Sequence, residues 1–314
     1  MKTIKQGIGK AAGKIILIGE HSVVYGEPAI AFPFPAAHVT TTAVPSDTMT
    51  IDCSYYSGPI SLIPATLKNI REAITQTLNV LKKKEFFSFT ITSTIPPERG
   101  MGSSAAVAVS VIRSIFDYYG YTYTLEELTE LINHSEKIAH GNPSGIDGAA
   151  VSGSQPLFFI KGQPLQTFPM NLKNTFLIVA DTGIKGQTRA AVQDVAHLFE
   201  LNNKETSTHI QKLGELTLES RNAILEENSQ LLGQTMDQAQ KILSELTVSH
   251  PAIDRLIQAA KIQGALGAKL TGGGRGGCVI ALADSQETAE KIASSFKENG
   301  AVTTWIQSLE DEQA

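Results

Sequence analysis

The sequence is poor in cysteine and has no long apolar run. Its 314 residues include only two cysteines, Cys53 and Cys278, which are too few for a disulfide framework at this length. We therefore expect two packed thiols in a reducing, cytoplasmic setting. The best apolar stretch, residues 29–37, falls short of the roughly 20 residues of a membrane span and is broken by Pro33 and Pro35. The N-terminus also lacks the apolar core of a signal peptide, so no membrane partner is expected.

An excess of positive charge is missing as well. The formal net charge is −5, whereas a protein held by nucleic-acid phosphates needs a basic surface, so no nucleic-acid partner is expected. An anionic small ligand is compatible with this charge, because a local site can be positive in an acidic protein. The composition, 42% hydrophobic and 18% charged, is that of a globular protein.

The length is about twice that of a typical domain and predicts two domains. Patterns of apolar residues predict strands at residues 14–18, 39–44, 49–53 and 86–95, and helices at 65–81, 103–119 and 124–140. In the second half they predict helices at 189–201, 206–246, 251–263 and 286–299, and strands at 176–180, 278–283 and 302–309. The stretch 206–246 is long enough for a helical hairpin. A turn-like stretch at 162–174 places the domains at 1–172 and 173–314.

A loop rich in glycine and serine, residues 97–106, joins a predicted strand to a predicted helix. Glycines let the backbone approach a ligand, and a helix start offers N–H groups and a positive dipole end, which together favour a phosphate. Ser103 and Ser104 add hydroxyls for a phosphate oxygen or a magnesium ion. The loop lacks the lysine of a Walker A motif and does not fit the dinucleotide-binding pattern. The alternative interpretation is an ordinary helix start.

Carboxylates follow in residues 136–147. Asp147 lies in a turn of small residues, where it could reach a substrate hydroxyl as a base or simply cap the next segment. Glu136 lies near the end of the preceding predicted helix, where it could hold a magnesium ion or be an exposed surface residue.

Two further segments place charge or glycine next to a predicted strand. Residues 13–26 put Lys14 and the pair Glu20–His21 at the two ends of an apolar run, and we expect Lys14 to lie at a strand end, outside the core. Its charge could neutralise phosphate. Residues 269–278 hold a dense run of glycines that would let the backbone pass close to a ligand, or act as a hinge.

These segments, in this order, resemble the GHMP kinases, a family of small-molecule kinases. Residues 13–26 are similar to the family's first motif, residues 97–106 to its ATP loop, and residues 269–278 to its third motif. The stretches 19–26 and 140–147 are similar to motifs of the mevalonate kinase branch, and differ from those of galactokinases, homoserine kinases and phosphomevalonate kinases.

The resemblance implies a role for each segment. Asp147 would be the catalytic base, with Lys14 beside it, and Ser104 with Glu136 would hold Mg²⁺. The residues facing mevalonate would be Glu20, His21 and Thr188. The ATP-binding residues would be Pro97, Glu98, Arg99, Gly100, Met101, Gly102, Ser103, Ser104, Ala105 and Ala106.

The fold implied by the resemblance is α+β, with an N-terminal domain like a ribosomal-protein domain, a ferredoxin-like C-terminal domain and the active site between them. The implied reaction is phosphorylation of mevalonate by ATP to 5-phosphomevalonate, in an enzyme family where homodimers are common. Ala12 and Arg275 depart from the family pattern, and Arg275 puts the shape of the third motif in doubt. Two alternatives stay open: a GHMP kinase for another alcohol, and an inactive protein that senses ATP or a metabolite.

Overall fold

The computed structural model describes residues 5–140 and 145–310, which divide into two compact units. The first unit contains the described residues of 1–14, 33–95 and 102–154, and the second those of 15–32, 96–101 and 155–314. Both units are discontinuous because the long strands β1 (Gly7–Ile18) and β2 (Ala29–Ser46) contribute residues to each. The predicted domains, 1–172 and 173–314, are continuous stretches of sequence, and the boundary between them stays a prediction.

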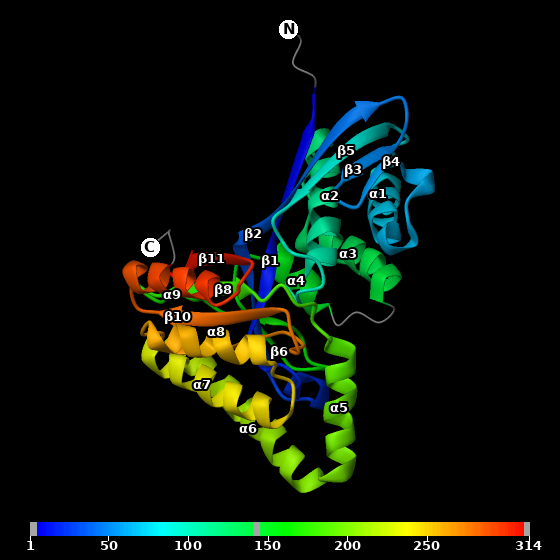
Figure 1. The fold of residues 1–314 in the computed structure, drawn as a ribbon. Coiled ribbons are helices and arrows are strands. Elements are labelled where there is room, and N and C mark those ends of the chain that lie inside the picture. The colour runs from blue at the N-terminus through cyan, green and yellow to red at the C-terminus, as the bar shows by residue number, and fades with distance from the viewer. Residues whose placement is uncertain (1–4, 141–144, 311–314) are drawn as a thin grey trace. The chain divides into compact units, whose positions relative to one another are not determined.

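The first unit is a mainly antiparallel sheet covered by helices (Figure 1). Its strands run in the order β4-β3-β5-β2, β1 pairs with β2, and only the β3–β5 pair is parallel among those with a described register. Besides β1 and β2, its elements are β3 (Thr50–Cys53), β4 (Tyr56–Pro59), α1 (Lys68–Val80), β5 (Phe86–Ser93), α2 (Ser103–Tyr119), α3 (Leu125–His140) and α4 (Ile146–Ser152), with short 3₁₀ turns at Ile60–Leu62 and Ala65–Leu67.

Helix α2 packs closely on the sheet because small residues line the contact. Gly7 and Gly9 of β1 lie so near the α2 backbone that an added side chain would clash with it. A buried hydrogen bond of 2.7 Å joins Thr41 Oγ1 of β2 to Ser110 Oγ of α2. Alternate residues of β5, such as Phe87 and Phe89, fill the core, as expected for a strand with one buried face.

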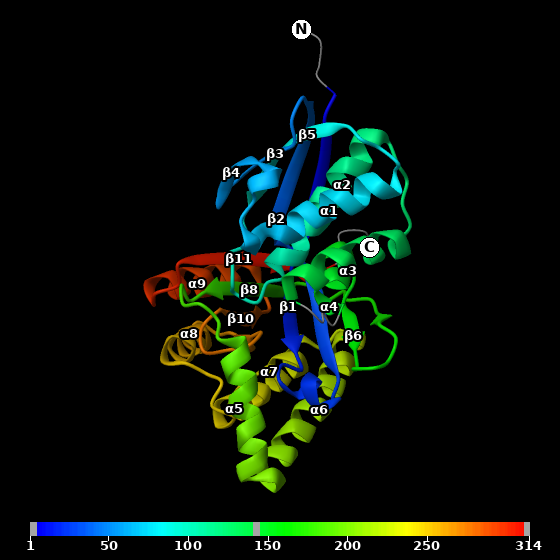
Figure 2. The same ribbon diagram turned by 90° about the vertical axis from the view of Figure 1, so that its right-hand side faces the viewer.

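The second unit contains a four-stranded antiparallel sheet in the order β11-β8-β10-β9 (Figure 2). Helix α7 lies along β9, α8 contacts β9 and β10, α9 contacts β8, β10 and β11, and α6 pairs with α7 as a hairpin. Its elements are the 3₁₀ turn η1 (Ser22–Tyr25), β6 (Leu157–Phe159), β7 (Gln166–Thr167), β8 (Phe176–Asp181), α5 (Thr188–Leu201), α6 (Asn203–Leu225), α7 (Ser229–Glu245), α8 (Pro251–Ile262), β9 (Gly267–Thr271), β10 (Cys278–Ala283), α9 (Gln286–Glu298) and β11 (Thr303–Ser308).

The predicted α+β class is confirmed, and most predicted elements are present. The capping box that begins α3 forms both of its hydrogen bonds, Thr124 N to Glu127 Oε2 at 2.8 Å and Glu127 N to Thr124 Oγ1 at 3.1 Å. The stretch 206–246 is indeed two helices, α6 and α7. Sequence patterns missed strand β9 and the course of β2, which continues through Pro33 and Pro35. None of the helices in the described residues is long and apolar enough to cross a membrane.

Candidate active site

Lys14 and Asp147 form an ion pair in the first unit. The Lys14 Nζ and Asp147 Oδ1 atoms are 3.0 Å apart, and the side chains are 6% and 43% exposed. Lys14 comes from β1 and Asp147 from the first turn of α4. The expectation that Lys14 lies at a strand end outside the core is wrong, because β1 begins at Gly7 and the lysine is buried within it. A buried charge needs a partner, and Asp147 is that partner while its own side chain stays partly exposed.

The N-terminus of helix α2 lies beside this lysine. Gly102 precedes the helix with a φ of 70°, and as a glycine it offers no side chain to cap the first N–H groups. A Cβ atom at Gly102 would come within 2.8 Å of Lys14 Cγ and 3.1 Å of Val151 Cγ1, so only glycine fits there. The 17-residue helix therefore directs its uncapped N–H groups and positive dipole end to the neighbourhood of the Lys14 side chain.

Ser104 and Glu136 lie together, as the sequence interpretation requires for a shared cation. Ser104 Oγ donates a 2.9 Å hydrogen bond to Glu136 Oε1, and the glutamate is only 4% exposed. Asn69 Nδ2 donates to Ser104 Oγ at 3.2 Å, while the Asn69 carbonyl accepts from Ser135 Oγ at 3.0 Å. The interpretation of Glu136 as an exposed surface residue is thereby excluded.

The first half of the glycine-rich loop, residues 96–101, belongs to the second unit and is anchored there by Arg99. Arg99 Nε donates to Asp181 Oδ1 at 2.8 Å, and its terminal nitrogen donates to the Gly183 carbonyl at 3.0 Å. Asp181 also accepts from the Gly183 N–H at 2.8 Å. The Arg99 guanidinium is thus engaged with protein groups at the end of β8.

The glycine run that follows β9 passes against this same half of the loop. An added Cβ at Gly100 would meet Gly272, and one at Gly277 would meet the carbonyl of Arg99. Arg275 does not disturb the run. It adopts a positive φ of 56°, its backbone N–H bonds to the Val248 carbonyl, and its side chain is paired with Asp194 of α5. The glycines thus let this run pass close to residues 99–100, while the predicted close approach to a ligand stays a prediction.

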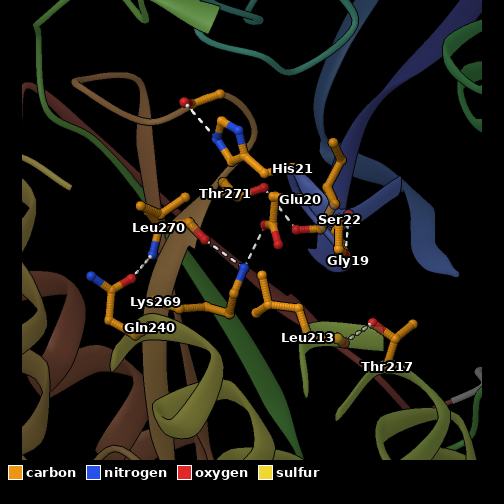
Figure 3. Close-up of polar contacts among 12 residues, drawn as sticks. Gly19, Glu20, His21, Ser22, Leu213, Thr217, Gln240, Lys269, Leu270 and Thr271 are labelled. Carbon is orange, nitrogen blue, oxygen red and sulfur yellow. Dashed lines mark hydrogen bonds and ion pairs between the residues drawn. The ribbon is translucent and has the colours of Figure 1, made fainter. Parts of the chain in front are cut away.

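Glu20 and His21 occupy the turn after β1 in the second unit (Figure 3). Both are buried, and Glu20 forms an ion pair with Lys269 of β9. His21 Nε2 lies 3.1 Å from the Gly273 carbonyl, while its Nδ1 atom is buried and has no hydrogen-bond partner. Burial lowers the pKa of His21 and so favours the neutral imidazole, partly opposed by the bond to Gly273.

Thr188 is the first residue of α5 and is exposed. It lies so close to Gly273 that a side chain at that glycine would clash with it. Gly273 therefore has His21 on its carbonyl oxygen and Thr188 beside its Cα, which brings together two of the three residues expected to face the substrate. The third, Glu20, points to Lys269 instead (Figure 3).

Residues 141–144, part of the predicted motif at 140–147, lie outside the described residues. Sequence reasoning passed over three residues that hold the others: Asn69 on Ser104, Asp181 on Arg99, and Lys269 on Glu20. The signal for Lys269 was present, because the alternation of Lys269 and Thr271 after Gly267 fits a strand. Asn69 and Asp181 carried no local signal.

The Arg99–Asp181 pair gives a stability prediction. Arg99→Ala should leave the Asp181 carboxylate buried without a cation, which costs about 3 kcal/mol when a buried pair loses one partner. At about 2–4 °C per kcal/mol for a protein of this size, the melting temperature should fall by several degrees. Lys185→Ala is the matched control, because it removes the exposed partner of Glu98 on the same loop and should change the melting temperature little. Equal melting temperatures for the two variants, measured by calorimetry, would contradict the anchoring role.

Comparison with known proteins agrees with the motif resemblance. The GHMP kinases N terminal domain family matches residues 65–154 and the GHMP kinases C terminal family matches residues 220–302. A curated mevalonate kinase of Aeropyrum pernix is 31% identical over 304 residues, covering 94% of each chain. The crystal structure of mevalonate kinase from methicillin-resistant Staphylococcus aureus MRSA252 is 33% identical, with a TM-score of 0.78 over 98% of this chain and 100% of that one.

The structure of L. major mevalonate kinase in complex with R-mevalonate is 26% identical, with a TM-score of 0.82 over 97% of this chain and 95% of that one. Sequence and fold thus match along nearly the whole chain. The chain belongs to the GHMP kinase family, in the branch formed by the mevalonate kinases.

Proposed function

We propose that this kinase transfers the γ-phosphoryl group of ATP to the primary hydroxyl of mevalonate, giving 5-phosphomevalonate for isoprenoid synthesis. The observation that carries the proposal is the Lys14–Asp147 ion pair of 3.0 Å beside the uncapped N-terminus of α2. The mevalonate kinases that match the whole chain support the choice of acceptor.

Asp147 acts as the base in this proposal. Phosphoryl transfer depends mainly on positioning and charge stabilisation, and the charge-assisted bond from Lys14 fixes the direction of the carboxylate. The half-exposed Asp147 is accessible to an incoming hydroxyl and can accept its proton as the oxygen attacks phosphorus. Lys14 then faces the negative charge that develops on the transferred group.

The phosphates of ATP bind at residues 97–106. The first N–H groups of α2 have no side-chain cap and suit phosphate oxygens. The side chain of Arg99 does not bind phosphate in this proposal, because its hydrogen bond to Asp181 anchors the loop. Gly102 allows the backbone to pass next to Lys14, so that the phosphate site and the base adjoin each other.

Ser104 and Glu136 would hold the magnesium ion that accompanies ATP. The Ser104 Oγ and Glu136 Oε1 atoms are 2.9 Å apart, and oxygen atoms are the ligands that Mg²⁺ prefers. No group of three or more His, Cys, Asp or Glu side chains gathers as a metal site in the described part of the chain. That is compatible with Mg²⁺, which takes one or two carboxylates and completes its shell with phosphates and water. The ion would neutralise phosphate charge during transfer.

Mevalonate binds at the turn of Glu20 and His21 and at Thr188. The buried, unpartnered Nδ1 of His21 and the exposed Thr188 next to Gly273 offer polar groups for its hydroxyls and carboxylate.

Two further proposals concern the cellular compartment and the oligomeric state. Both cysteines are free, which supports a reducing cytoplasm, and a homodimer follows from the family resemblance.

Asp147→Asn tests the base. The substitution keeps the size of the side chain and removes the proton acceptor, so kcat should fall about 10²-fold or more while ATP still binds. Turnover is measured by coupled assay and ATP affinity by calorimetry. Asp52→Asn, which changes an exposed carboxylate of the same unit, serves as the control. A folded Asp147→Asn enzyme with near-normal kcat would return Asp147 to the role of a turn residue.

Ser104→Ala and Glu136→Gln test the metal site. Each removes an oxygen donor, so the magnesium concentration for half-maximal activity should rise several-fold, because hard cations depend on such ligands. Glu130→Gln, on the exposed face of α3, should leave this concentration unchanged. Magnesium titrations that coincide for all three variants and the unmodified protein would show that the ion is held elsewhere.

A panel of alcohols tests the substrate. With mevalonate, phosphomevalonate, galactose and homoserine offered separately, mevalonate should be phosphorylated by a wide margin. A site that matches one small acid leaves buried polar groups unpaired with its analogues and rejects them steeply. Preference for another alcohol would contradict the branch assignment. ATP binding without phosphorylation of any of the four would favour the sensor alternative.

A further inference from the structure

A fully buried ion pair joins Lys269 to Glu20 in the second unit (Figure 3). The two side chains are 0% and 2% exposed, and every residue of the lysine's strand, β9, is buried. Lys269 Nζ also donates a 2.6 Å hydrogen bond to the Leu270 carbonyl. A charge in such a place is costly unless it is paired, so Lys269 depends on Glu20 to remain buried in this strand.

Lys269 is one of three alternate residues that contact the end of β1 and the turn after it. Side chains in a strand alternate between its faces, so Lys269 and Thr271 point the same way. Thr271 Oγ1 donates to the Ile16 carbonyl at 2.8 Å, and just beyond the strand the Gly273 carbonyl lies 3.1 Å from His21 Nε2. Three alternate residues of the third motif thus contact residues 16–21.

The turn needs such support because its backbone is strained. His21 has a φ of 62°, which is unfavourable for a residue with a side chain. Its Nδ1 atom is nevertheless kept buried and unpartnered. A strained, polar residue persists only where its surroundings over-determine it, and the Lys269–Glu20 pair is the charged part of those surroundings.

We propose that Lys269 is a positioning residue for the substrate-binding turn, residues 19–22, and acts through the carboxylate of Glu20. The proposal rests on the proposed function, which places the substrate at this turn. Direct contact between Lys269 and substrate does not fit, because the lysine is fully buried and its ammonium group is engaged by Glu20 and Leu270. Glu20 accordingly serves the site by fixing the turn.

Neighbouring elements in the described residues place other charged and titratable groups near the pair. Arg275, from the glycine run, and Lys269 itself lower the pKa of His21, adding to the larger effect of burial. Helix α7, packed on β9, contributes Asp237, which is already paired with Lys261 of α8. Strand β10 contributes Cys278, whose pKa is raised by burial, so it stays a neutral thiol.

Lys269→Gln separates positioning from a purely structural role. Glutamine keeps a hydrogen-bond donor near Glu20 but removes the charge that lowers the pKa of His21, so the pKa of the His21 imidazole should rise, as followed by NMR. A His21 imidazole with a raised pKa becomes protonated at a higher pH and so loses its neutral form as the solution is acidified. We therefore expect kcat/KM for mevalonate to drop about tenfold or more at acidic pH, with KM for ATP unchanged.

The control is Lys291→Gln, which breaks the exposed Lys291–Glu287 pair of 2.7 Å on helix α9 of the same unit. It should leave the His21 titration and the pH profile unchanged. A folded Lys269→Gln protein with the original His21 pKa and pH profile would overturn the proposal, even if its melting temperature fell.

A second variant covers a failure to fold. If Lys269→Gln does not fold, Glu20→Gln/Lys269→Gln removes both charges, and the His21 titration is repeated there. A raised His21 pKa supports the proposal, and an unchanged pKa overturns it. Failure of the unmodified protein to phosphorylate mevalonate would contradict the proposed function alone, because the NMR titration needs no substrate.

Discussion

The burial of Lys14 inside strand β1 is the constraint on which the rest of the site depends. An ammonium group in a buried strand needs a carboxylate, and Asp147 supplies it at 3.0 Å from the first turn of α4. The stem of the lysine also needs space, and Gly102 supplies it where α2 begins. A single buried charge thus brings together a strand, a helix start and a half-exposed carboxylate, the parts that phosphoryl transfer requires.

The same physical device recurs in the second unit. Arg99–Asp181 fixes the first half of the glycine-rich loop, and Lys269–Glu20 fixes the turn that carries His21. In each case a charged side chain from a buried position holds a segment whose backbone has positive φ values, such as Glu98 or His21. Hydrophobic packing is non-directional, whereas a paired charge fixes both distance and direction, which suits loops that must present polar groups to a ligand.

Local sequence signals predicted much of this fold. The capping box at Thr124, the alternating residues of β5 and the glycine that ends α2 each act over a few residues, so they are visible in the sequence. The glycine-rich loop and its serines were likewise found from local chemistry. The resemblance to GHMP kinases then joined segments whose individual signals were weak.

What the sequence did not predict depends on partners far along the chain. Lys14 was expected at a strand end, outside the core, because the apolar run that predicts its strand begins at residue 14, whereas β1 begins at Gly7. Its place beside Asp147 was implied by the resemblance alone. Asp181 and Lys269 were passed over because their partners, Arg99 and Glu20, lie far along the chain, although the alternation of Lys269 and Thr271 itself fits a strand. The resemblance had already implied that Lys14 lies beside Asp147, whereas the ion pairs Arg99–Asp181 and Lys269–Glu20 were found only in the structure.

The most direct test of the central claim is a crystal structure of the protein with mevalonate and a non-hydrolysable ATP analogue. If the Lys14–Asp147 pair is the reaction centre, the primary hydroxyl of mevalonate should lie within hydrogen-bond reach of Asp147, about 2.6–3.2 Å, with the γ-phosphate analogue next to the N-terminus of α2. A hydroxyl bound away from Asp147, with another side chain in that position, would contradict it.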